Sequence, residues 1–69
     1  MNLREEMIQA AYDHAKAHVL KHKMNVEIYL MNPVGVGEHS DVMDAIETEL
    51  EEMAKYEDHM DILNKYFSI

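Results

Sequence analysis

The segment 32–39 constrains the fold of this chain most, because it contains the only proline and both glycines. It lies between two long segments in which apolar residues recur at helical spacing. Proline lacks a backbone N–H and disfavours helix in the residue before it, so a helix that reaches Asn32 should end there. Glycine adopts positive φ at little cost, which suits a chain reversal. The sequence therefore predicts an all-α helical hairpin, with helices over about 3–31 and 41–66 and a connector at 32–39.

The first helical segment carries two apolar stripes rather than one. Together they form an arc of apolar surface that is wider than a single partner helix can cover. Asn2 is placed to cap this helix, with Glu5 three residues later as in a capping box. The first stripe consists of Leu3, Met7, Ala10, His14, Ala17, Lys21, Met24, Ile28 and Met31, and the second of Ile8, Ala11, Ala15, Val19, Val26 and Leu30.

The second helical segment has one apolar stripe, which a single glutamate interrupts. Ser40 or Asp41 can cap its N-terminus. We expect Ile46 and Met53 to be core residues, and the opposite face of the helix to be acidic and exposed. The stripe runs through Val42, Ile46, Glu49, Met53, Tyr56, Met60, Leu63 and Phe67.

Residues 24–30 allow a second interpretation. They alternate apolar and mostly polar positions and are rich in β-branched residues, as a strand would be. The rest of the chain offers no further strand beyond the short piece 34–36, and an unpaired strand is not stable in water. A strand here needs a partner strand from another copy, so we favour helix and keep the strand as the alternative.

The 69 residues form a single domain, 1–69, that is too small to bury a large core and has no cysteine for a disulfide. Two helices alone cannot enclose a core. We therefore expect a homodimer that forms a four-helix bundle, in which a second copy supplies the missing half of the core. Seven methionines suit adaptable packing of this kind.

The negative charge lies almost entirely in the second half of the chain. Residues 1–31 hold four acids and four bases, whereas residues 32–69 hold ten acids against Lys55 and Lys65, which gives the net charge of −8. Such a surface argues against nucleic acid and against anionic membranes as partners. It is compatible with a basic protein partner or with mimicry of nucleic acid, although a solvated helix face explains it most simply. No apolar run reaches the roughly 20 residues of a transmembrane helix.

Three histidines are the strongest candidates for chemistry. His14, His18 and His22 lie at i, i+4 and i+8, and neighbouring imidazoles at this spacing can bind a metal ion. If the hairpin folds back with Leu30 opposite Val42, His14 also comes level with Asp58 and His59. Each i,i+4 step rotates by about 40°, so at most two of the three histidines should reach one ion. We therefore predict no metal, and keep a His-based metal-binding protein as an alternative.

Other patterns of catalytic chemistry are incomplete. The segment Gly35-Val36-Gly37 lacks the third glycine and the preceding strand of a phosphate-binding loop. The acid pairs Glu51-Glu52 and Glu57-Asp58 have no predicted pocket that would shift their pKa values. The sequence predicts no catalytic residue, no cofactor and no small-molecule substrate, so we expect a protein that is not an enzyme.

A family resemblance rests on the run Val26–His39, followed by Asp41-Val42 and Ala45-Ile46-Glu47. This run, with its Asn-Pro-Val-Gly-x-Gly-Glu-His connector, resembles small proteins encoded by marine T4-like cyanophages, and the likeness covers residues 24–67. The resemblance implies a viral origin and expression in the cytoplasm of an infected bacterium, but no particular activity. We expect an acidic helical protein that self-associates and binds another protein, with an accessory component of a virus particle as the alternative.

Overall fold

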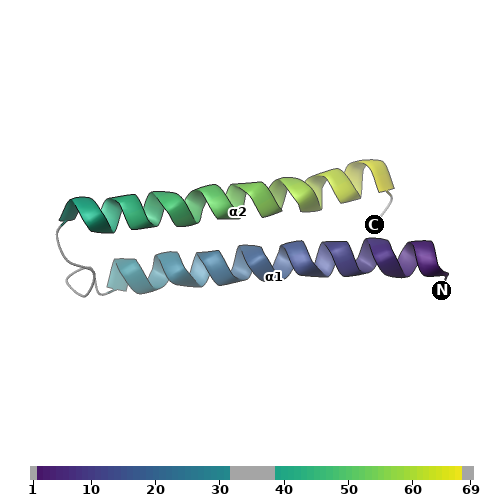
Figure 1. Cartoon of the computed structure of the whole chain (residues 1–69), viewed down its shortest axis with the longest axis horizontal. Helices are drawn as coiled ribbons and strands as arrows, with labels where there is room; N and C mark the ends of the chain where they lie inside the picture. The colour runs from purple at the N-terminus through teal and green to yellow at the C-terminus, as the bar shows by residue number, and fades with distance from the viewer. Residues whose placement is uncertain (1, 32–38, 68–69) are drawn as a thin grey trace.

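The chain forms two antiparallel helices that lie side by side (Figure 1). The computed structural model describes residues 2–31 and 39–67, where α1 spans Leu3–Met31 and α2 spans His39–Phe67. Each helix has 29 residues and is therefore about 43 Å long. The molecule measures 50 × 17 × 12 Å, so it is one helix thick. The predicted all-α hairpin is confirmed, whereas the predicted connector lies outside the described residues apart from His39, which begins α2.

The ends of the helices follow from local sequence. The backbone N–H of Glu5 donates to Asn2 Oδ1 at 2.9 Å, so Asn2 is the predicted N-cap of α1. In α2, Asp41 lies in the first turn and Lys65 in the last, where each charge is favourable to the helix dipole. Residues 24–30 continue α1 without a break, so they are helical and the strand alternative is wrong.

The two helices pair in the predicted register. With Leu30 opposite Val42, the numbers of facing residues add up to about 72. For pairs of residues that contact each other across the interface, the two residue numbers add up to values close to 72. Their sums are 71 for His22 with Glu49, 74 for His18 with Tyr56, and 70 for His14 with Tyr56. The register therefore holds across the middle of the hairpin.

The predicted stripe of α2 faces α1. Val42 and Ile46 are buried, and the rest of the stripe as far as Leu63 is half-buried, including the predicted core residue Met53. Only Phe67, at the open end of the hairpin, is largely exposed. Because α2 has one apolar stripe, the sequence identified its inner face correctly.

On α1 the second stripe, and not the first, faces α2. Residues on the inner face of α1 recur at steps of four and three. Two members of the predicted second stripe, Ala11 and Leu30, are exposed and do not belong to this face. His22 lies on this inner face and is buried, although it belongs to neither of the two predicted stripes. The buried and half-buried residues in this repeat are Ile8, Tyr12, Ala15, Val19, His22, Val26 and Tyr29.

The first stripe of α1 lies on the outside of the hairpin. Each of its residues from Ala10 to Ile28 follows one inner-face residue by two positions and precedes the next by one or two. The stripe therefore points outward and toward one side of the hairpin, where His14 still contacts Tyr56. Its large side chains are highly exposed: Leu3 by 71%, Met7 by 62%, Met24 by 63%, Ile28 by 58% and Met31 by 81%. We call this set, with Ala10, His14, Ala17 and Lys21, the outer stripe.

The core between the helices is small. Among the described residues, the only buried apolar side chains are Ala15, Val42 and Ile46, and none of the large side chains is fully buried. A hairpin with so little buried apolar area has a small margin of stability. Its large apolar residues are divided between the inner face and the outer stripe.

Ile46→Asp should unfold the hairpin. Ile46 is buried, so the substitution places an unpaired carboxylate in the core at a cost of several kcal/mol, which is comparable to the whole stability of so small a domain. Far-UV circular dichroism should show the loss of helix. Leu50→Asp, on the exposed part of the same helix, is the matched control and should change stability by less than about 1 kcal/mol. Equal effects of both substitutions would contradict the assigned inner face of α2.

Candidate functional site

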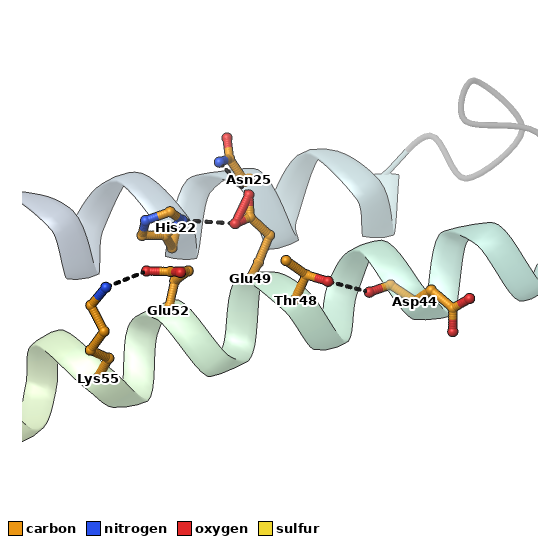
Figure 2. A network of polar contacts seen from close by, with 7 residues as sticks. All are labelled: His22, Asn25, Asp44, Thr48, Glu49, Glu52 and Lys55. Carbon is orange, nitrogen blue, oxygen red and sulfur yellow. Dashed lines mark hydrogen bonds and ion pairs between the residues drawn. The ribbon is translucent and has the colours of Figure 1, made fainter.

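A polar contact crosses the middle of the helix interface (Figure 2). The Nδ1–H of His22 donates to Glu49 Oε2 at 2.7 Å, and the side-chain amide of Asn25 donates to Glu49 Oε1. Both oxygens of the carboxylate are therefore engaged by α1. The side chains of His22 and Glu49 are only 11% and 13% exposed, so the contact is largely shielded from water. Glu49 is the residue that interrupts the apolar stripe of α2, and His22 and Asn25 explain why a glutamate fits there.

The surroundings of Glu49 favour its charged form. Partial burial alone would raise the pKa of this carboxyl group, but the hydrogen bonds from His22 and Asn25 act in the opposite direction. The positive charges of His22 and Lys21 add to them, and the net effect lowers the pKa of Glu49. The carboxylate is thus held ionised inside the interface.

Four histidines surround Tyr56 next to this contact. We call His14, His18, His22 and His59 the histidine cluster. The ring of His18 stacks on Tyr56 with centroids 4.1 Å apart and planes inclined by 13°. His14 and His59 meet the edge or face of the same ring at 5.9 and 5.4 Å, in T-shaped contacts. Tyr56 and His59 both belong to α2, so only the contacts of Tyr56 with the histidines of α1 cross the interface. Aromatic pairs contribute about 0.5–1.5 kcal/mol each beyond the area they bury.

His18 is half-buried and has a buried ring nitrogen. Its Nδ1 is buried and makes no hydrogen bond within residues 2–31 and 39–67. Burial lowers the pKa of His18, and the nearby positive charges of His14, Lys21 and His22 lower it further, against a weaker opposing effect of Glu52. The fold therefore disfavours protonation of this imidazole.

The structure brings together three of the candidate metal ligands but does not form a site from them. The ring centroids of His14 and His18 are 4.5 Å apart, while Tyr56 lies between these rings and His59. Among the described residues, no group of three or more His, Asp or Glu side chains is arranged to hold a metal ion. That the protein binds no metal stays a prediction.

Sequence reasoning missed the roles of Asn25, Glu49 and Tyr56 in this region. A signal for the first two was present: Glu49 was the only charged residue in the stripe of α2, and the predicted register placed it level with Lys23, between His22 and Asn25. Nearby on α2, Lys55 contacts Glu52 at 3.4 Å (Figure 2). This pair is exposed and contributes at most a few tenths of a kcal/mol.

The outer stripe is the second candidate site. At the open end of the hairpin it continues into an apolar groove of about 450 Å³, lined by Leu3, Arg4, Met7, Ile8 and Phe67. No helix in the described part of the chain has an apolar stretch long enough to cross a lipid bilayer. An exposed row of large apolar side chains on a helix is typical of a protein–protein contact.

Acid should destabilise the protein through two groups, whose contributions begin to be lost at different pH values. The folded pKa of His18 lies below its unfolded value of 6.5, so stability falls as the pH drops from above 6.5 through that folded pKa. The folded pKa of Glu49 lies below 4.5, so its contribution is fully present above pH 4.5 and is lost as the pH falls further. Thermal unfolding followed between about pH 8 and pH 3 should show both steps.

Two substitutions assign these steps. His18→Gln should remove the upper step and Glu49→Gln the lower one. Glu51→Gln, on the exposed face of α2, is the matched control and should leave both in place. A lower step that persists unchanged in Glu49→Gln would show that other carboxylates cause it.

Comparison with protein-family models, with curated proteins and with solved structures finds no match to this chain. Two features of the molecule therefore carry the functional argument. The contact of His22 and Asn25 with Glu49 and the stacking of His18 on Tyr56 lie between the helices and fix how they meet, whereas His14 belongs both to the histidine cluster and to the outer stripe. The outer stripe is available to another molecule, so it is the feature that bears on what the protein binds.

Proposed function

We propose that this protein is a small acidic interaction module, which self-associates through its helices and acts by binding another protein. The observation that carries the proposal is the exposure of the outer stripe on the outward side of α1. Five large apolar side chains, two near one end of the stripe and three near the other, leave too much apolar surface in contact with water for an isolated hairpin.

The size of the core supports the same proposal. Between the helices only Ala15, Val42 and Ile46 are buried apolar residues among those described, in a chain of 8.1 kDa. Chains this short commonly need a metal, disulfides or self-association to fold stably. The chain has no cysteine. A second copy adds apolar contacts without any further component, and the dimer then contains four helices.

Purified protein should have a mass of at least two chains of 8.1 kDa each. Its midpoint of thermal unfolding should rise with protein concentration, because association stabilises the folded form by mass action. Sedimentation equilibrium at micromolar concentrations and circular dichroism over a hundredfold dilution series provide the two measurements. A monomer that unfolds cooperatively at a temperature independent of concentration would contradict the proposal.

The proposed partner is a protein with a basic surface, because α2 carries nine acids against two bases. The proposed location is the cytoplasm of an infected bacterium, which rests on the sequence resemblance over residues 24–67.

Affinity capture from infected cells should retain a partner that about 0.5 M salt releases. The double substitution Glu47→Lys with Glu51→Lys should abolish this capture. Capture of host proteins would support a regulator, and capture of virus-particle proteins would support the alternative of a particle component. Capture that is unchanged by the double substitution and by about 0.5 M salt would contradict the acidic face of α2 as the binding surface.

A further inference from the structure

The charges of the two helices differ in a way that selects the face for self-association. α1 contains four acids and four bases and has no net charge, whereas α2 contains nine acids and two bases. Two copies that met through the outside of α2 would bring two strongly acidic surfaces together. Contact through α1 avoids this repulsion and buries apolar side chains instead.

We propose that two copies of the chain pack antiparallel along the outer stripe of α1, giving four helices in the order α2, α1, α1 of the second copy, α2 of the second copy. This inference rests on the self-association proposed above and adds its face, direction and register. It replaces a compact bundle with a layered arrangement in which the α1 helices form the centre.

The spacing of the outer stripe matches itself in the antiparallel direction. The stripe advances by alternating steps of four and three residues, the repeat that lets two helices interdigitate along their length. In one antiparallel register, large side chains meet large ones at both ends: Leu3 meets Ile28 of the second copy, and Met7 meets Met24. In the middle, Lys21 and His14 each lie opposite an alanine. An alanine leaves room for the lysine stem to lie along the contact while its ammonium group reaches water.

A parallel arrangement is less favourable because it places identical residues opposite each other. Lys21 would then face Lys21 of the second copy, and His14 would face His14. In the antiparallel register the two lysines are 11 residues apart along the helix axis, or about 16 Å. This separation exceeds the Debye length of about 8 Å at physiological salt, so their repulsion is largely screened.

A compact bundle would need an apolar row along one edge of the hairpin, where α1 and α2 meet. Residues that directly follow inner-face positions lie along one such edge. This edge carries four exposed large apolar residues, Leu20, Leu30, Met43 and Leu50, with Lys16, Lys23, Glu47 and Glu57 among them. Residues that directly precede inner-face positions lie along the other edge, where α2 contributes the exposed Ile62 and Tyr66 beside Glu52, Lys55 and His59. Charged residues from both helices interrupt each edge, and the first edge has four large apolar side chains against the five of the outer stripe.

A matched pair of lysine substitutions tests the face. Met24→Lys lies in the outer stripe and Leu50→Lys on α2, and both residues are largely exposed in the hairpin, by 63% and 49%. Met24→Lys should weaken self-association by more than about 100-fold, since the symmetric contact would bury two unpaired ammonium groups. Leu50→Lys should leave the affinity within about threefold, which is the scatter of near-neutral surface substitutions. Sedimentation equilibrium measures both.

Cysteine cross-linking tests the direction and register, because the natural chain has no cysteine. A mixture of Met7→Cys and Met24→Cys chains should form disulfide-linked pairs, since the two positions face each other. Neither variant should cross-link with itself, because identical positions lie 17 residues, or about 25 Å, apart, far beyond the reach of a disulfide. Self-cross-linking of Met7→Cys would show a parallel dimer, and no cross-linking in the mixture would exclude this register.

These measurements distinguish an error in the proposed contact face from an error in the proposed self-association. A wild-type protein that is monomeric at all concentrations would contradict the proposed function itself. A wild-type dimer that survives Met24→Lys but not Leu50→Lys keeps self-association and overturns the outer stripe as its face. A dimer that survives both substitutions overturns the face as well, because neither α1 nor the tested part of α2 then carries it.

Discussion

A hairpin of two helices has a single interface, and every other feature of this structure follows from that constraint. Each helix can bury one stripe of side chains against the other, so any further apolar stripe remains outside. α2 has one stripe and buries it, with Val42 and Ile46 innermost. α1 has two, and the stripe led by Leu3 and Met7 is left exposed. This mismatch between the number of apolar faces and the number of partner helices is the physical reason for the self-association that we propose.

The polar contact between the helices explains why they meet in one register. Apolar stripes with the same repeat can slide by a turn and still bury similar areas, so they specify alignment weakly. The contact of His22 and Asn25 with both oxygens of Glu49 is lost by such a slide, which would leave a carboxylate largely buried and without partners. We infer that this contact contributes more to the choice of register than to the free energy of folding.

Much of the fold could be predicted from sequence, because the helix ends, the stripe of α2 and the register all follow from local patterns such as the cap at Asn2. The inner face of α1 could not, since both of its stripes have helical spacing and similar apolar content. The burial of His22 decided between them, and a histidine is neither clearly apolar nor clearly charged near neutral pH. The aromatic packing around Tyr56 depends on side chains from both helices, and the spacing within one helix does not reveal it.

The charge distribution also explains why association through α1 would stop at two copies. A symmetric contact uses the outer stripe of both chains, so no apolar stripe of this length is left to recruit a third. The outsides of the assembly are then the two α2 helices, each with nine acids and two bases. Like charges on these surfaces oppose further stacking of dimers, and they keep the acidic faces in water. In the proposed dimer, the apolar face of one helix would drive pairing and the acidic face of the other would limit it.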